Sequence, residues 1–153
     1  MFKIGKKESA NCYFCSDFPE TLDHLFCDCR KVVPLWEKLV DKINASTDHS
    51  HNLTLSKFNY LFGIHSGDKH DSCINFLCLC LKYYIYSCRF QGKELIFEVF
   101  VSMVKFKQKI EYKIAQKKNK LHVHFKKWSI KFNWSFVVVL QRSVVIDIVK
   151  ECL

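Results

Sequence analysis

Cysteines and a histidine near the N-terminus follow the spacing of metal ligands, and this cluster constrains the fold most strongly. The segment NCYFCSDFPETLDHLFCDC covers residues 11–29 and holds Cys12, Cys15, His24 and Cys29 in the pattern C-x2-C-x8-H-x4-C. The C-x2-C step is a short turn in which two thiolates can face one ion, and the His-x4-Cys pair can complete a tetrahedron. Three thiolates and an imidazole with no open position favour a structural zinc site.

The spacing leaves two points open. Cys27 also lies near His24, so it competes with Cys29 for the fourth ligand position. The alternative to a metal site is a set of buried free cysteines and a surface histidine. A redox-active C-x-x-C is disfavoured because no βαβ pattern surrounds the motif. If zinc binds, it stabilises a segment that has almost no hydrophobic core of its own.

The rest of the chain is predicted to be mainly α-helical. Four glycines and two prolines in 153 residues leave little material for the tight turns of an all-β fold. Apolar residues recur at helical spacing over 35–43, a short helix is expected before Gly63, and residues 73–90 are apolar on nearly every face. A helix of that last kind is normally buried, so it is expected to form the hub of the core.

A long amphipathic helix is expected from Glu94 onwards. Its apolar period misses one position near Lys117, so the helix could be continuous or broken around KKNK. Its core-facing apolar stripe is Met103, Phe106, Ile110, Ile114, Leu121, Phe125 and Trp128. The predicted organisation is an N-terminal segment (1–11), a zinc-binding segment leading into a helix (12–36), a helical domain (37–128) and a divergent tail (129–153). The tail alternates and then becomes β-branched, and its structure stays open.

The positive charge is concentrated in one segment. The net charge is +9; residues 1–70 are balanced, and residues 105–131 hold ten lysines against the single acid Glu111. At 100° per residue, five lysines share one flank of the predicted helix, and three more add to it: Lys105, Lys109, Lys113, Lys120 and Lys127, then Lys117, Lys118 and Lys126. Such a flank is expected to contact the phosphates of nucleic acid, although a solvated flank that binds nothing is the alternative.

Several functional classes are disfavoured by what the sequence lacks. It has no Gly-rich phosphate loop, no nucleophile elbow and no paired carboxylates, which favours a binding protein over an enzyme and predicts no small-molecule substrate. It has no secretory signal and no run of about 18 apolar residues, so no membrane association is expected. Nine cysteines without a signal peptide favour a reducing compartment, the nucleus or the cytoplasm.

The stretch CYFCSDFPETLDHLFCDCRKVVPLWEKL resembles the zinc-binding segment that follows the reverse transcriptase domain in LINE-type non-LTR retrotransposon polyproteins. That family has a C-x2-C pair, an acidic loop, ET-x-x-HLF-x-x-C and a helix with V-x-x-x-W. The resemblance continues through NYLFGI, INFLCLCLKYYIYSCRF, FEVFVSMVKFKQKIEYKIA and KNKL-x-x-HFKKW, and so covers about residues 12–128. The matching positions in the first block are Cys12, Cys15, Glu20, Thr21, His24, Leu25, Phe26, Cys29, Val32 and Trp36.

This resemblance implies that Cys29, rather than Cys27, is the fourth zinc ligand, and that residues 94–128 form one continuous helix without a strand. It also implies an accessory role, in which the module contacts template RNA or target DNA during target-primed reverse transcription, beside its parent polymerase. Met1 lies only 11 residues before the first ligand. The endonuclease and polymerase domains are therefore expected to be missing, and no polymerase activity is expected.

The sequence thus predicts a non-catalytic, zinc-binding, nucleic-acid-binding module that is a truncated remnant of such a polyprotein. Two other hypotheses remain. In one, the chain is a protein-interaction module that docks on the polymerase or another partner through exposed apolar helix faces. In the other, it is a retrotransposon remnant without a function.

Overall fold

The computed structural model describes residues 10–47 and 52–130, and in these residues the fold is mainly helical, as predicted. Asn11 and Pro19 form an isolated antiparallel bridge, and no sheet occurs in the part of the chain that is described. The predicted tail, apart from residues 129 and 130, lies outside the described residues. The elements are η2 (His24–Asp28), α1 (Val33–Asn44), α2 (Lys57–Phe62), α3 (Asp71–Gln91), α4 (Phe97–Lys117) and α5 (Leu121–Lys127).

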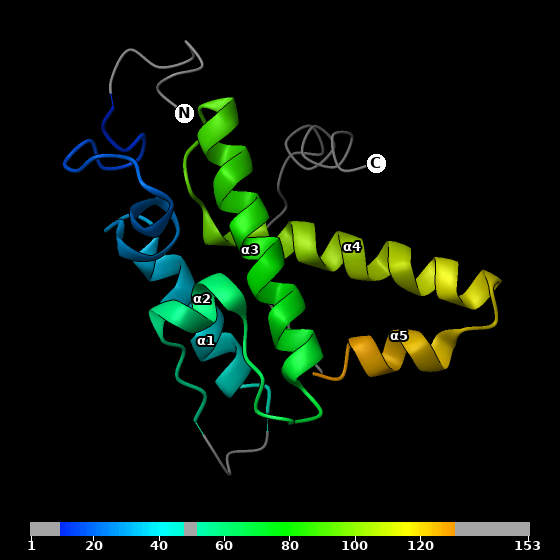
Figure 1. The fold of residues 1–153 in the computed structure, drawn as a ribbon. Coiled ribbons are helices and arrows are strands. Elements are labelled where there is room, and N and C mark those ends of the chain that lie inside the picture. The colour runs from blue at the N-terminus through cyan, green and yellow to red at the C-terminus, as the bar shows by residue number, and fades with distance from the viewer. Residues whose placement is uncertain (1–9, 48–51, 131–153) are drawn as a thin grey trace.

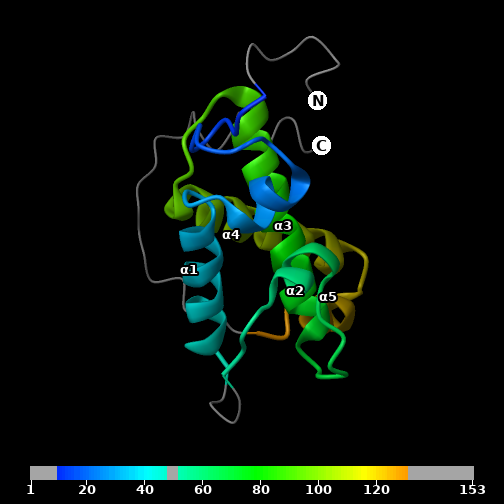
Figure 2. The ribbon, with the colours of Figure 1, turned by 60° about the vertical axis from the view of Figure 1, so that its left-hand side comes forward.

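Helix α1 connects the cysteine-rich segment to the core (Figure 2). Pro34 lies in its first turn, where the missing N–H costs no hydrogen bond. Trp36 is fully buried; its Nε1–H donates to the carbonyl of Phe26 at 2.6 Å, and its ring stacks on Tyr60 of α2 at 4.5 Å. One side chain therefore holds η2, α1 and α2 together.

Helix α3 is the hub of the core, as expected, but one of its sides is exposed. Leu77, Leu81 and Ile85 are fully buried, whereas Leu79 and Phe90 are exposed. The charge at its centre is also accounted for, because Lys82 donates to the carbonyl of Leu61 at the C-terminal end of α2. The prediction of a helix buried all round was therefore right for most of its surface and wrong for one strip.

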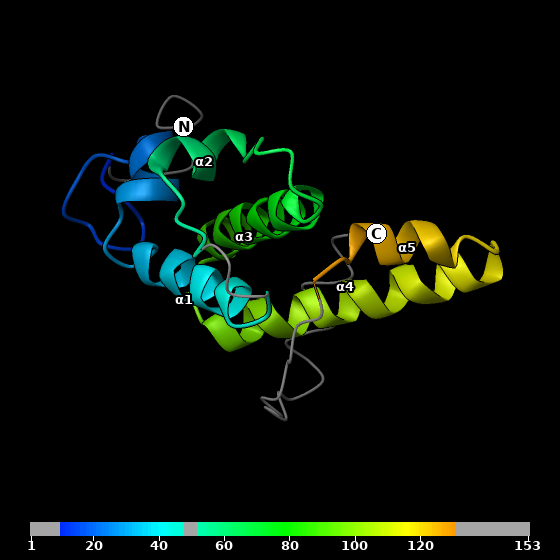
Figure 3. The same ribbon diagram turned by 90° about the horizontal axis from the view of Figure 1, so that it is seen from below.

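Helices α4 and α5 form an antiparallel hairpin that projects away from the other helices (Figures 1 and 3). The chain reverses at Asn119, which has a φ of +54°. The N–H of Lys120 bonds to the carbonyl of Ala115, and that of Asn119 bonds to Gln116, a Schellman-type helix end with asparagine at the left-handed position. The break around KKNK, which the sequence left open, is therefore present.

The continuous helix implied by the family resemblance is therefore wrong, although its helical assignment of LHVHF is right. Because α5 folds back on α4, the helical period does not run through residue 119. A short network closes the hairpin: Lys127 and the Nε1–H of Trp128 both donate to the carboxylate of Glu111 at 2.9 Å. Among the helices described, none has the length and hydrophobicity that a membrane span requires.

Candidate metal centre

The four predicted ligands come from two short local structures. Cys12 and Cys15 lie on a turn in which the Cys12 N–H bonds to the Phe18 carbonyl at 2.7 Å and the Ser16 N–H bonds to the Cys12 carbonyl at 2.9 Å. His24 begins η2 and Cys29 follows its end, with the Cys29 N–H on the His24 carbonyl at 2.8 Å. Each half of the motif is therefore positioned by its own backbone hydrogen bonds.

The ligand atoms of Cys12, Cys15, His24 and Cys29 converge within 4.8 Å of one another, and all four residues are buried. The Sγ atoms of Cys12 and Cys29 are 3.8 Å apart, and Cys15 Sγ lies 3.2 Å from His24 Nε2. A tetrahedron with zinc–sulfur bonds of about 2.3 Å has sulfur–sulfur edges of about 3.8 Å and sulfur–nitrogen edges of about 3.6 Å. The group thus has the donor set and nearly the dimensions of a zinc site.

Backbone N–H groups and neighbouring side chains set the protonation of the sulfurs. Burial raises the pKa of Cys15, but hydrogen bonds from the backbone of Asp17, from His24, Cys12 and Phe18 outweigh it and lower the pKa to about 7. Burial raises the pKa of Cys29 to about 12, and the nearby Cys12 sulfur adds to the rise. Without a cation, three thiolates cannot share this space; a divalent ion supplies the charge that makes them compatible.

Cys27, the competing ligand, is buried but lies outside this group. Burial and the Asp28 carboxylate raise the pKa of its thiol, which is the behaviour of a small core residue. Of the alternatives that the spacing left open, the structure therefore brings Cys29 to the other three ligands. No other group of three or more potential ligands occurs among residues 10–47 and 52–130.

Glu20 links the cluster to the core through an ion pair that sequence reasoning did not find. Its Oε1 accepts bonds from Nε and Nη2 of Arg89 on α3, at 3.0 and 2.8 Å, and its Oε2 accepts the Tyr13 N–H at 3.1 Å. The side chains of Glu20 and Arg89 are only 7% and 10% exposed. Because the partners are 69 residues apart, no local pattern could have paired them.

The structure divides the predicted lysine flank. Lys105, Lys109 and Lys113 do share one side of α4, but Lys127 turns back to pair with Glu111, and Lys105 is half-buried. The prediction that Lys120 and Lys127 lie on the same flank as these lysines is therefore wrong, because the reversal at residue 119 interrupts the helical period on which it rests. Lys107, outside the predicted set, is exposed on α4 as well. The remaining exposed members of the predicted set are Lys109, Lys113, Lys117, Lys118, Lys120 and Lys126.

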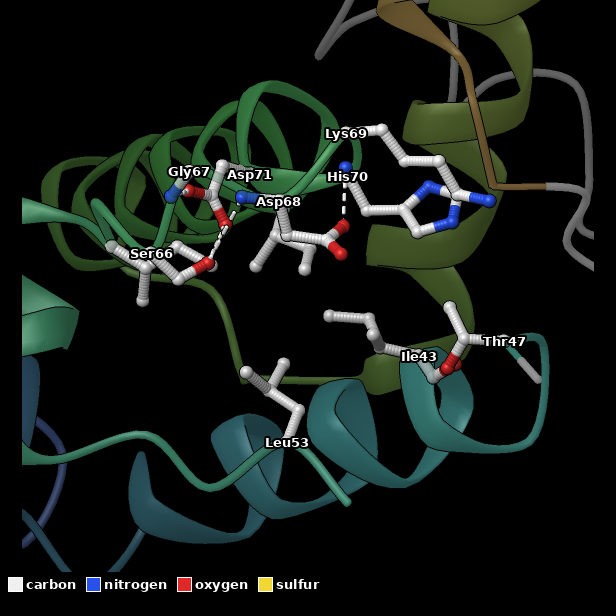
Figure 4. A pocket seen from close by; sticks show the side chains of 11 residues that line it. Ile43, Thr47, Leu53, Ser66, Gly67, Asp68, Lys69, His70 and Asp71 are labelled. Carbon is white, nitrogen blue, oxygen red and sulfur yellow. Dashed lines mark hydrogen bonds between the residues drawn. The ribbon is translucent and has the colours of Figure 1, made fainter. Parts of the chain in front are cut away.

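A cavity of about 680 Å³ opens between the end of α1 and the start of α3 (Figure 4). Its polar groups bond to the chain itself: the Asp71 carboxylate accepts from Ser66 Oγ and the Gly67 N–H, and Asp68 accepts the His70 N–H. His70 Nδ1 in turn lies 2.9 Å from Ser129 Oγ. These interactions order the loop that leads into α3, so the polar side chains that make them have a structural role.

Fold and site together define a small, mainly helical protein with a buried three-cysteine, one-histidine group that could hold a metal ion such as zinc. Neither the models of known protein families, nor curated proteins, nor solved structures provide a match to this chain.

Proposed function

We propose that the chain is a non-catalytic, zinc-binding, nucleic-acid-binding module. Cys12, Cys15, His24 and Cys29 hold the ion, and the lysines of the α4–α5 hairpin contact phosphates. The observation that carries the metal half of the proposal is the convergence of these four buried ligand atoms within 4.8 Å. With four protein ligands and no open position, the role of the zinc is to hold the fold together.

The metal centre acts on the rest of the module through two connections. Trp36 joins η2 to α1 and α2, and the Glu20–Arg89 pair joins the C-x2-C turn to α3. Zinc therefore braces the N-terminal segment against the hub helix. The free energy of metal binding becomes folding free energy for this segment.

The nucleic-acid half of the proposal is supported by charge. Between residues 105 and 128, nine lysines face one acidic residue, Glu111, and most of these lysines are exposed on the hairpin. Phosphate contacts supply affinity without sequence selectivity and weaken steeply as salt rises. Affinity that does not change between low and physiological salt would refute this part of the proposal.

The resemblance to the region downstream of LINE-type reverse transcriptases suggests where such a module acts. Its support is the order of the sequence blocks from CYFC to HFKKW. On this proposal, the chain binds template RNA or target DNA as an accessory to a polymerase domain, which is then also a partner. A reading frame with polymerase motifs in the neighbouring genomic sequence would support this origin.

A protein-docking module is the second candidate, because exposed apolar side chains outside the hairpin favour it. Phe58 and Phe62 of α2 are exposed and lie 4.8 Å apart, ring centre to ring centre, and Leu79 and Phe90 of α3 are exposed as well. These exposed side chains predict self-association or poor solubility when the chain is expressed alone. Replacing Lys109, Lys113 and Lys117 by glutamate separates the two functions, because nucleic-acid binding should vanish while docking survives.

The test of the metal centre is the zinc content per chain. We expect the wild type and Cys27→Ser to retain one zinc and Cys12→Ser to lose it, because Cys12 belongs to the converging group and Cys27 does not. Loss of zinc from both variants, or from neither, would overturn the ligand assignment.

A further inference from the structure

The α4–α5 hairpin exposes apolar side chains that the sequence pattern assigns to the core. Phe106, Ile114 and Phe125 all belong to the predicted core stripe, yet they are 37%, 47% and 58% exposed. Only the ends of that stripe, Met103 and Trp128, are buried. The reason is the reversal at residue 119, which leaves the distal half of α4 with α5 as its neighbour and places the turn end of the hairpin away from the hub helix (Figure 3).

Phe125 is the most exposed of these rings, and lysines lie close in sequence both to it and to Tyr112, its neighbour across the hairpin. Its ring lies 6.4 Å from that of Tyr112 on α4. Tyr112 is three residues after Lys109, a spacing that places the two on the same side of a helix, and Lys113 is the next residue. Lys109, Lys113 and Lys126 are exposed. We call Lys109, Tyr112, Lys113, Phe125 and Lys126 the hairpin aromatic site.

We propose that the hairpin aromatic site binds single-stranded nucleic acid, with one base stacked on Phe125 and the adjoining phosphates against the lysines. The inference rests on the proposed function and adds to it the form of the nucleic acid and the residue that holds a base. Aromatic rings set among positive charges are the recurring means of binding single strands, because every base has a face that can stack.

The charge and the exposed ring of the site favour single-stranded nucleic acid over a duplex or a protein partner. In a duplex the base faces are covered, so a duplex can use the lysines of the site but cannot use the exposed ring. A protein partner is disfavoured because lysine is depleted from the buried centre of protein interfaces. Single-stranded nucleic acid, which carries phosphates and has bases free to stack, therefore matches both the lysines and the exposed ring of the site.

The test uses the zinc-loaded full chain and fluorescence anisotropy with a short oligothymidine strand and with a blunt mixed-sequence duplex of the same length. Phe125→Leu keeps an apolar side chain over Tyr112 but removes the flat ring, and Phe125→Tyr keeps the ring. We expect the wild type to bind the strand more tightly than the duplex. Phe125→Leu should weaken strand binding about tenfold, with the duplex unaffected, and Phe125→Tyr should bind as the wild type does.

The matched control is Tyr86→Leu, which removes another exposed ring, 39% exposed, on α3. It should change neither affinity. Circular dichroism and zinc content show that each variant is folded. If the strand and the duplex bind equally and Phe125→Leu has no effect, the further inference is wrong while the proposed function survives.

Other outcomes also decide the matter. If neither nucleic acid binds, the nucleic-acid half of the proposed function and the further inference fall together. If vesicles containing phosphatidylserine bind in place of the strand, and Phe125→Leu binds them as well as the wild type, the site contacts a membrane surface through its apolar area. If Phe125→Leu instead alters the oligomeric state in solution, the ring belongs to a contact between copies of the chain.

Discussion

Breaking the ion pair between Glu20 and Arg89 tests how the metal-binding segment is attached to the core. The pair is 7% and 10% exposed, and the guanidinium donates two bonds to one carboxylate oxygen, at 2.8 and 3.0 Å. Glu20→Gln leaves the Arg89 charge buried and uncompensated. Removing one partner of a buried pair costs about 3–5 kcal/mol, a large part of the about 5–15 kcal/mol by which a domain is stable.

The assay is urea denaturation of the zinc-loaded protein, followed by circular dichroism, for Glu20→Gln, Arg89→Met and the double variant. Each single variant should lower the free energy of unfolding by about 3 kcal/mol or more. The double variant should lose clearly less than the sum, because no unpaired charge remains in it; a coupling energy above about 1 kcal/mol is expected.

The matched control is the exposed pair of Arg30 and Asp17, whose side chains are 67% and 41% exposed. Asp17→Asn should change stability by less than about 1 kcal/mol, since solvent screens exposed ion pairs. Additive effects of Glu20→Gln and Arg89→Met, or an effect of Glu20→Gln no larger than that of Asp17→Asn, would refute the view that this pair anchors the segment.

Four further outcomes are expected. Trp36→Phe keeps a ring against Tyr60 but leaves the Phe26 carbonyl without its donor, so the denaturation free energy should fall by about 1–3 kcal/mol. Asn119→Val should lower the melting temperature, because a left-handed φ of +54° costs a β-branched residue about 1–2 kcal/mol, whereas Asn119→Gly should not. Acidification should release zinc, measured with a chromophoric chelator, because three thiols must lose protons to bind it and the pKa of Cys29 is raised to about 12 by burial. Burial also raises the pKa of the Cys78 thiol from its usual 9 to about 12. The contribution of the neutral thiol to stability is therefore complete below pH 9 and is lost as the pH rises towards 12, by about 1.4 kcal/mol per pH unit. Over that range the urea midpoint of Cys78→Ala should fall less steeply than the midpoint of the wild type.

The cysteine cluster shows how far spacing alone can go. The C-x2-C turn and the His-x4-Cys pair are local structures, and the ligand types follow directly from them. The choice between Cys27 and Cys29 does not follow from spacing, because two residues so close in the chain differ only in the direction in which the η2 turn orients their side chains. The turn is a π-helical one, a geometry that residue spacing does not predict.

The long C-terminal helix shows the opposite case. Its apolar period is real, and the loss of a beat near Lys117 does mark the break at Asn119. Yet the period also predicts that Phe106, Ile114 and Phe125 are in the core, and they are exposed. Periodicity states which side of a helix is apolar, but whether that side is covered depends on where the neighbouring helices lie.

The sequence by itself determined what depends on neighbouring residues: most of the helices, the two ligand pairs and the concentration of lysines after residue 104. Only the tertiary structure showed that Cys29, which spacing left in competition with Cys27 and the family resemblance favoured, meets the other three ligands. It alone showed that the chain reverses at Asn119, that Glu20 pairs with Arg89, and that Phe125 of the hairpin aromatic site faces solvent. The physical reason is the range of the interactions. Helix formation and capping act over about four residues, whereas burial and ion pairing join segments that the chain separates by dozens.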